Sequence, residues 1–506
     1  MSSSTPTLAH HPASVPRPAV VAIGSHRAIV AAAMVLVTAS IATQAYWLAT
    51  GDDFGFGAVP AFNPAGIGNV PVFALTALLA CSAATSAVLA AALRQQGAAG
   101  AGAWALLAAG QLALSVQRLV LTRPRFNDDP AWRTVGYALP PAVRPRDALL
   151  LAGIAAGLAV VAGAWRTAAA VRGRLATGTA LFIAGAALGA VAGLGLDAPV
   201  ADPRVIAAAL AIAARALELL GAALVLDAAA RRLAAVAPDL RLVVGDAAPR
   251  PIGVRGTSDG ILVEVSPRRL DRALTLAIVA LVVLSTAAIW AYGRWPEAQR
   301  VHRMFYLDYE TNVPTWWSSM QLLACAAAAG FLARAARSVA DDRWPHWLAL
   351  ALLFAAMAAD EAASLHELAA GWLQTPLRAL LHTTWLRYPL IVPGVIVGVV
   401  LAFHFRRFMR TIGPTRRRLA IAGATFALGA LVFEMIGGWF APEAVGANTT
   451  YEVVMTIEET LEMIGSAMVL LALLRHVAQE TGRNGLPLRD PSWPASAARR
   501  STATSH

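Results

Sequence analysis

Acidic side chains in the second half of the chain have the residue types and spacing of a cation site. Asp308, Glu310 and Asn312 place three oxygen-bearing side chains at alternate positions of one short segment. Hard cations such as Ca²⁺ prefer oxygen-rich loops of this kind. His366 offers a ring nitrogen, which Zn²⁺ and iron accept as a ligand. The predicted cofactor is therefore a divalent cation, with Ca²⁺, Zn²⁺ and iron as the alternatives.

A second acidic group lies further along the chain at helical spacing. Glu458 and Glu462 are four residues apart, and Glu459 and Glu462 are three apart, so these side chains share one face of a helix. Like charges so close repel one another and need a metal, arginines or protons beside them. We predict that Glu434, Glu458 and Glu459 are catalytic, one of them as a general base. The predicted metal ligands are Asp308, Glu310, Asn312, Asp360, Glu361, His366 and Glu462.

No strict metal motif accompanies these residues. His-Glu-x-x-His does not occur in the sequence, and the spacing from Glu361 to His366 differs from the Glu-x-x-His of di-iron bundles. Each group also has a simpler interpretation. Residues 308–312 can cap the helix after them, residues 360–361 can end a helix at the membrane interface, and residues 458–462 can line water at an outer vestibule.

Composition defines the elements that must position these side chains. Of the 506 residues, 58% are hydrophobic and 14% are charged, and the mean hydropathy is +0.59. Soluble domains are nearer half apolar and a quarter charged. The composition excludes an ordinary cytosolic enzyme, a disordered protein and a disulfide scaffold. It indicates an all-α fold, a polytopic transmembrane helix bundle.

Twelve segments are apolar over the length of about 20 residues that a membrane-spanning helix needs. They are residues 28–50, 72–93, 101–121, 148–167, 175–196, 204–228, 272–292, 316–337, 345–363, 388–405, 418–440 and 450–474. We predict a disordered tail over 1–27, six-helix modules over 28–228 and 272–476, a cytoplasmic linker over 229–271 and a C-terminal cytoplasmic tail over 477–506. Within the linker, residues 240–244 and 261–265 are strand-like.

Arginine placement predicts the orientation. All 41 basic residues are arginine and the net charge is +11, but the arginines lie mostly between apolar runs, which indicates topology rather than a nucleic-acid partner. Residues 406–418 hold six arginines and residues 51–71 hold none, whereas residues 122–147 disagree with the same orientation. We predict a bacterial-type cytoplasmic membrane, both termini in the cytoplasm, and membrane lipids as partners.

The two predicted modules share sequence at a nearly constant offset. The tripeptide Asn-Val-Pro at 69–71 recurs at 312–314, Leu-Leu-Ala-Cys at 78–81 recurs at 322–325, and Glu218 aligns with Glu462. An offset of 243 or 244 over about 150 residues predicts two tandem six-helix repeats. An even number of spans gives both copies the same orientation, as in the parallel repeats of some transporters.

The copies differ in their charges. The second copy has Asp308, Glu310, Asp360, Glu361, Glu434, Glu458 and Glu459 where the first has Ala65, Ile67, Gln117, Arg118, Ala190, Ala214 and Arg215. A charge at the centre of a spanning helix costs about 2.5–3.5 kcal/mol on insertion scales, so we expect the acids of the second copy to form the site. In the first copy, Arg118 and Arg215 either pair with Glu218 or bind a lipid head group.

One short segment resembles part of a known family. The loop carrying Asp308, Glu310 and Asn312 is similar to the acidic, Asn-containing calcium loop of alkaline ceramidase-type membrane hydrolases, which also hold zinc within their bundle. The paired histidines of that family's last helix are absent here, and Glu458 and Glu462 occupy that kind of spacing. The module also has six predicted spans, whereas that family has seven. The resemblance covers a handful of residues and does not make the chain a member of the family.

Three functions fit these observations. The first is a metal-dependent membrane enzyme acting on a lipid or lipid-linked substrate, with the acids at the outer half of the membrane. The alternative is a proton- or cation-coupled secondary transporter. The third is a scaffold whose acids are merely solvated. The sequence does not decide whether the protein is an enzyme, and it names no substrate.

Overall fold

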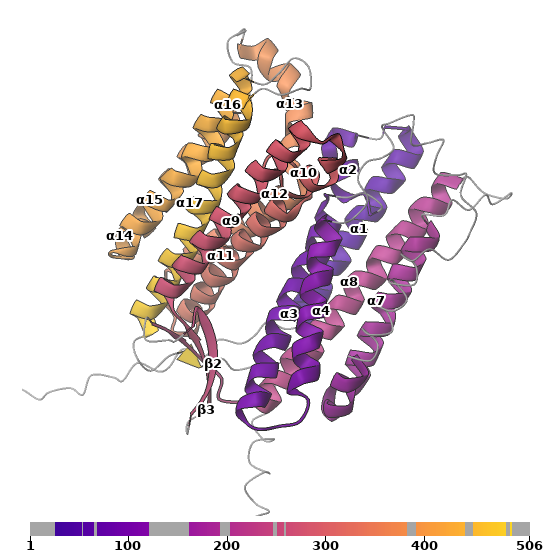
Figure 1. The fold of residues 1–506 in the computed structure, drawn as a ribbon, viewed down its shortest axis with the longest axis vertical. Helices are drawn as coiled ribbons and strands as arrows, with labels where there is room; N and C mark the ends of the chain where they lie inside the picture. The colour runs from indigo at the N-terminus through magenta and orange to yellow at the C-terminus, as the bar shows by residue number, and fades with distance from the viewer. Residues whose placement is uncertain are drawn as a thin grey trace, which may run out of the picture.

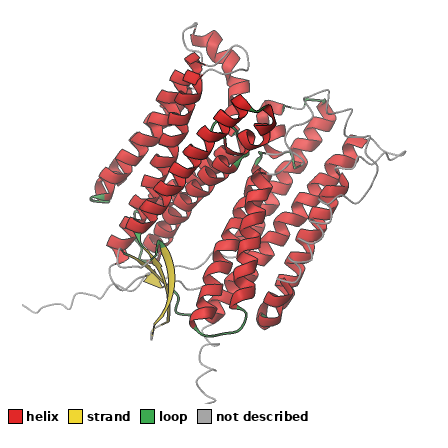
Figure 2. Cartoon of the chain, in the orientation of Figure 1, coloured by secondary structure: helices red, strands yellow, loops and turns green. Residues whose placement is uncertain are grey.

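The computed structural model of the chain describes residues 26–52, 54–64, 68–120, 161–192, 203–245, 250–257, 260–381, 391–440, 449–481 and 486–487. These residues are mostly helical, and the long helices run side by side (Figure 1, Figure 2). Because the backbone hydrogen bonds of a helix are satisfied within it, an apolar helix can lie in lipid without exposing polar groups.

Five long helices in the first half of the chain lie wholly within the described residues. They are α1 (His26–Thr50), α3 (Val70–Gln95), α4 (Ala101–Val120), α7 (Arg172–Ala192) and α8 (Pro203–Val236), with the short α2 (Ala58–Phe62) between α1 and α3. α3 packs on α4 and on α8, and α7 packs on α8.

The second half begins with α9 (Pro267–Arg294) and the short α10 (Gln299–Phe305). It continues with α11 (Val313–Ser338), α12 (Trp344–Ala363), α13 (Leu365–Leu381), α14 (Ile391–Thr411), α15 (Thr415–Ala427), a π-helical segment (Leu428–Phe433), α16 (Glu434–Phe440) and α17 (Thr449–Thr481). α11 packs on α12 and α17, and α15 packs on α17.

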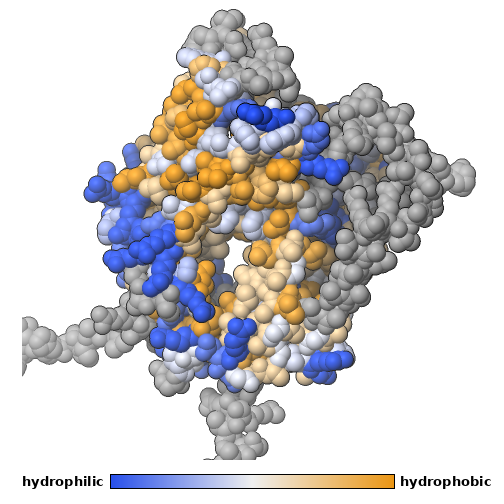
Figure 3. Space-filling model, viewed as in Figure 1, coloured by the Kyte–Doolittle hydropathy of each residue, from blue (hydrophilic) through white to orange (hydrophobic). Residues whose placement is uncertain are grey.

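Ten helical stretches in the described residues are long and apolar enough to cross a membrane, and each overlaps one of the twelve predicted spans. The predicted span 175–196 is helix α7, which is not among those ten. The predicted span 148–167 lies mostly outside the described residues, as do most of the predicted tails 1–27 and 477–506. The structure therefore supports a membrane protein. Apolar side chains cover much of the face seen in Figure 3, and they border a hollow in its centre.

The predicted linker between the halves contributes three strands to a small sheet. Strands β1 (Arg241–Val244) and β3 (Gly260–Val265) overlap the two strand-like segments of the sequence, and β2 (Ile252–Thr257) and β4 (Leu486–Pro487) complete the order β2-β3-β1-β4. β1 and β3 pair in parallel, with Arg241 opposite Leu262, while β2 and β4 pair antiparallel to their neighbours. The sheet lies at one end of the helices (Figure 2).

Two asparagines start corresponding helices in the same way. The side chain of Asn69 accepts a hydrogen bond from the backbone N–H of Val72 (2.9 Å) and donates to the carbonyl of Asn63 (2.7 Å). The side chain of Asn312 accepts from the backbone N–H of Thr315 (3.0 Å) and donates to the carbonyl of Tyr306 (2.5 Å). Each asparagine thus caps its helix and holds the preceding loop.

Glycines allow close helix contacts at matching positions of both halves. A Cβ on Gly185 of α7 would lie 2.8 Å from Glu218 Cγ, and one on Gly429 would lie 3.0 Å from Glu462 Cγ. Likewise, a Cβ on Gly221 would lie 2.5 Å from the backbone nitrogen of Phe182, and one on Gly465 would lie 2.7 Å from that of Phe426. Small residues let helix backbones approach closely, which stabilises packing in lipid.

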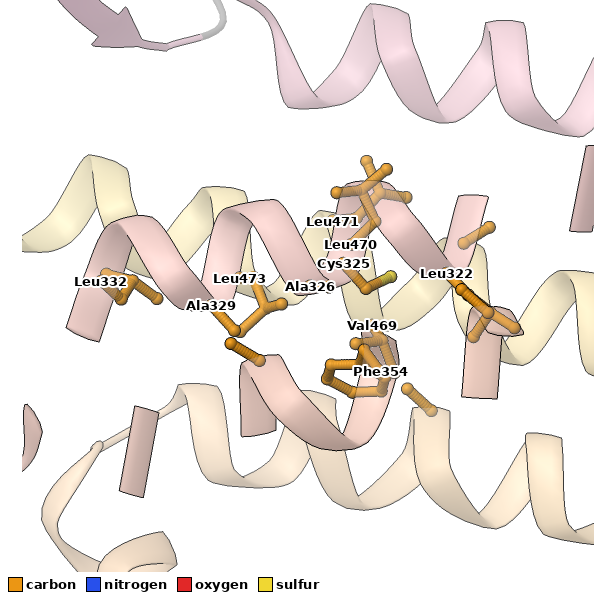
Figure 4. Close-up of a cluster of buried hydrophobic side chains, with 14 of the residues drawn as sticks. Leu322, Cys325, Ala326, Ala329, Leu332, Phe354, Val469, Leu470, Leu471 and Leu473 are labelled. Carbon is orange, nitrogen blue, oxygen red and sulfur yellow. The ribbon is translucent and has the colours of Figure 1, made fainter. Parts of the chain in front are cut away.

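The core of the second half joins α11, α12 and α17. Figure 4 shows Cys325, Phe354 and Val469 among the apolar side chains of these helices. Next to them, the Gln321 side chain donates to the carbonyl of Met463 and to the hydroxyl of Ser466, both at 2.6 Å. Interhelical hydrogen bonds of this kind fix helix positions where water is absent.

A buried ion-pair triad joins α4 and α8 in the first half. Glu218 accepts from Arg215 at 2.7 Å and also pairs with Arg118, and its carboxylate is almost fully buried. The predicted pairing of these three residues is confirmed. A carboxylate shared by two guanidinium groups is one of the few ways to keep a charge at membrane depth.

We expect Glu218→Gln to lower the unfolding free energy by about 3–5 kcal/mol, because it leaves buried positive charge without its carboxylate. The measurement is the thermal unfolding midpoint of the purified protein in detergent. Glu264→Gln is the matched control, since Glu264 pairs with the exposed Arg255 on the sheet, where an ion pair contributes little. An equal unfolding midpoint for both variants would contradict a stabilising role of the triad.

Candidate functional site

A cavity of about 1770 Å³ lies within the second half of the chain. Among the described residues, its polar end contains nine carboxyl side chains and one histidine, and no arginine is among its lining residues. We call this part the acidic end. The carboxyl groups are those of Asp308, Glu310, Asp360, Glu361, Glu367, Glu434, Glu458, Glu459 and Glu462.

Every predicted site residue except Asn312 lines this cavity. They come from the loop before α11, from the end of α12, from α13, from α16 and from α17. The side chain of Asn312 is buried, and its oxygen also accepts a hydrogen bond from the Thr315 hydroxyl at 3.0 Å. In this structure Asn312 is a helix cap, which matches the simpler interpretation of the 308–312 loop.

A break between two helices positions His366. Ser364 ends α12 in the left-handed conformation, with φ of 47°, and the chain starts again as α13 at Leu365. The backbone N–H of His366 donates to Asp360 Oδ1 at 2.7 Å, and its Nδ1 lies 3.2 Å from Asp360 Oδ2. The sequence alone predicts no separate helix here. The turn brings His366 back over the end of α12.

In the part of the chain that the structure describes, Glu310, His366 and Glu367 bring three potential ligand atoms together. One ligand atom from each lies within 4.8 Å of the others. Glu310 and His366 are predicted ligands, whereas Glu367 is not among the predicted ligands. The sequence gives little indication that Glu367 lies beside Glu310, because this position depends on the turn at Ser364.

Asp308 is held by aromatic hydroxyl groups. The Tyr451 hydroxyl donates to Asp308 Oδ2 at 3.2 Å, so the loop before α11 is tied to the start of α17. Burial raises the pKa of Asp308 to about 6, although hydrogen bonds from Tyr451 and Tyr306 oppose the rise. The sequence does not predict that either tyrosine bonds Asp308, since a tyrosine in an apolar segment is usually interpreted as an interface residue.

The charges of the acidic end act on one another. Burial raises the pKa of Glu310, and the negative charges of Glu361 and Glu367 raise it further. For His366, burial opposes the charged form, but the hydrogen bond to Asp360 and the charges of Asp360 and Glu310 outweigh it, so its pKa is raised. Each group therefore prefers the state that reduces the excess negative charge.

The row of glutamates on α17 extends the acidic end into the spanning region. Glu458, Glu459 and Glu462 all line the cavity, and Glu462 is close enough to Glu361 and Glu434 for their charges to interact. One oxygen of Glu458, Oε2, is buried without a hydrogen-bond partner, as is Oε2 of Glu310. Buried carboxylate oxygens without partners are costly, which marks this end as a place for a positively charged or donating group.

The π-helical segment Leu428–Phe433 directly precedes Glu434. A π-helical turn inserts an extra residue into the helix and changes the direction of the side chains after it, and such turns are frequent at functional sites. Glu434 begins α16 and lines the cavity together with Gly437 and Gly438. The segment also carries Gly429, where a Cβ would meet the Glu458 carbonyl at 2.8 Å.

Residues 273–477 match a protein family described as a domain of unknown function (DUF8692). The match runs from the first turns of α9 to near the end of α17 and includes all residues of the acidic end. No curated protein and no solved structure matches the chain.

We expect Gly429→Val to lower the unfolding free energy by about 1–3 kcal/mol, because the added side chain forces the π-helical segment away from α17. The measurement is again the thermal unfolding midpoint in detergent. Gly423→Val is the control, since a Cβ at Gly423 meets no atom within 4 Å. A control variant as unstable as Gly429→Val would contradict the assignment of this contact.

Proposed function

We propose that the protein is a multi-pass membrane enzyme that uses a divalent cation at the acidic end to act on a lipid or lipid-linked substrate. The observation that carries the proposal is the convergence of Glu310, His366 and Glu367 at one end of a cavity among apolar helices. The same end holds further carboxyl groups that can take or give a proton.

The donor set suits a transition metal better than Ca²⁺. Two carboxylates and one imidazole are a mixed oxygen and nitrogen set, which Zn²⁺ and iron accept, whereas Ca²⁺ takes oxygen ligands. Three protein ligands leave a coordination position for water or substrate, as catalytic sites require. Asp360 Oδ2 lies within hydrogen-bond distance of His366 Nδ1 and so fixes the direction of the imidazole ring. Metal-binding histidines are commonly oriented by a carboxylate on the ring nitrogen that does not bind the metal.

The bound cation would supply Lewis-acid activation of a water or of a substrate oxygen. Glu434 and Glu458 line the cavity near this group, and one of them accepts the proton of the attacking water as general base. Tyr451 holds Asp308 and keeps the loop before α11 against α17.

The matching contacts of the two halves support an internal duplication. The asparagine caps lie 243 residues apart, and the contacts of Gly185 with Glu218 and of Gly429 with Glu462 lie 244 apart. In the first half the shared glutamate pairs with two arginines. We infer that this half is a structural copy and that the chemistry belongs to the second.

The proposal predicts that purified protein carries about one equivalent of Zn²⁺ or iron. We expect His366→Ala and Glu367→Gln to weaken metal binding about 10–100-fold or more, because each removes one of three ligands and even the loss of a supporting partner costs that much. The measurement is elemental analysis by mass spectrometry after dialysis, together with titration of the metal-free protein.

Glu452→Gln is the matched control, since Glu452 lies on α17 but does not line the cavity. Full metal content in both ligand variants would sink the proposal. Loss of metal in the control as well would show that binding depends on overall stability rather than on these ligands.

A secondary transporter is the second candidate, and the repeated helix contacts favour it, since many carriers are built from repeats. Against it, the acidic end lies within one half, whereas transport sites usually lie between repeats. A transporter predicts uptake into vesicles that depends on a pH or cation gradient and is lost in Glu462→Gln. Uptake that does not depend on any imposed gradient would contradict this second candidate function.

A further inference from the structure

The same cavity has a second, apolar part. Beyond the acidic end its walls are formed by side chains of α12, α14 and α15, and we call this part the apolar arm. Its lining residues include Leu350, Phe354, Met357, Leu401, Phe405 and Met409, with Leu419 and Phe426 from α15.

The apolar arm is long. Glu434 comes fifteen residues after Leu419 along the same helical stretch, or about 22 Å at the rise of an α-helix. One leaflet of the hydrocarbon core is about 15 Å thick. The cavity volume of about 1770 Å³ also exceeds the range of about 300–1,000 Å³ typical of sites for small ligands. These dimensions suit an extended hydrocarbon chain.

The arm is open at its side. α14 contacts the π-helical segment, and Phe408 near its end packs on Trp347 of α12 with ring centroids 4.8 Å apart. Val397, which lines the arm, is 55% exposed. The opposite wall has small residues, among them Gly423 and Ala427. Because α14 is one of the helices apolar enough to cross a membrane, its exposed face meets lipid chains rather than water. A chain can therefore enter sideways from the bilayer.

The charge at the head of the arm selects the ligand. Glu458, Glu459 and Glu462 stand where the arm meets the acidic end, and among the lining residues that the structure describes neither part has an arginine. A cation held by Glu310, His366 and Glu367 leaves these three carboxyl groups without a positive partner among the lining residues. Charge complementarity disfavours a free phosphate or carboxylate head group there and favours a protonated amine.

We propose that the apolar arm binds the hydrocarbon chain of a lipid whose head group carries a protonated amine, with the amine against Glu458, Glu459 and Glu462. The proposal rests on the proposed function and names its substrate class. The amine would hold the head group beside Glu310 and His366, so that a bond near the amine faces the cation group.

The test is photo-crosslinking in nanodiscs of phosphatidylcholine. The probe is hexadecylamine with a diazirine at the chain end, and the matched probes are the alcohol and the fatty acid of equal length. We expect the amine to label residues of the arm such as Met409 and Leu419 about tenfold more than the other probes do. Glu458→Gln combined with Glu459→Gln should abolish this preference.

Gly423→Trp should block labelling in the arm, because its side chain would fill open space in the cavity. Ile421→Trp is the control on the same helix, since Ile421 is 46% exposed and does not line the cavity. Equal labelling by amine and alcohol in the unaltered protein, or full labelling of Gly423→Trp, would overturn the proposal.

Metal content measured on the same sample separates the two proposals. If the protein is purified without metal and still shows amine-selective labelling, the lipid site is supported and the metal-dependent function is contradicted. Stoichiometric metal with no labelling of the arm supports the metal site and overturns the lipid inference.

Discussion

A carboxylate at membrane depth must have a positive partner, and the two halves of this chain meet that requirement differently. In the first half Glu218 lies between Arg118 and Arg215, so its charge is balanced within the protein. In the second half the corresponding Glu462 lines a cavity whose described lining has eight other carboxyl groups and no arginine. Its balance has to come from protons, a metal ion or a ligand, because desolvated like charges cannot all remain ionised. The rest of the second half is arranged around that demand.

Close packing and chain breaks together hold the acids in place. Gly429 and Gly465 bring α15 and the π-helical segment against α17, and Gln321 fixes α11 to α17 beside the glutamates. Ser364 breaks α12 and returns His366 to Asp360. The acidic end is thus built from rigid helices at its base and from short turns at its rim. Rigid helices give precision to a site, and turns allow groups from different spans to meet.

Much of the spanning architecture can be predicted from the sequence, because long apolar runs have few other structures available to them. The Asn312 cap and the pairing of Arg215 with Glu218 are each one of two outcomes that the local spacing predicts, whereas Arg118 reaches Glu218 from a helix a hundred residues away. The place of Glu367 beside Glu310 was not predictable, because it depends on the left-handed conformation of Ser364, which no residue pattern indicates. The apolar arm was equally hidden. Leu401 and Leu419 look like ordinary lipid-facing or core residues, and only the placement of α14 and α15 around the cavity makes them part of its wall. The number of spans, the sidedness and the chemistry of the acids stay predictions.

The small sheet has a mechanical consequence. β1 continues from α8 of the first half, β3 leads into α9 of the second, and β4 comes after α17, so three helix ends are clamped to one another by strand pairing. Away from the sheet, the halves are joined by side-chain contacts such as the bond from Trp316 to Ser115. At the end opposite the sheet, where α13 and α10 lie (Figure 1), the halves also touch, since a Cβ on Gly57 would lie 3.3 Å from Leu368 Cβ of α13. Rocking of one half against the other is therefore opposed at both ends, by strand pairing at one and by this contact at the other.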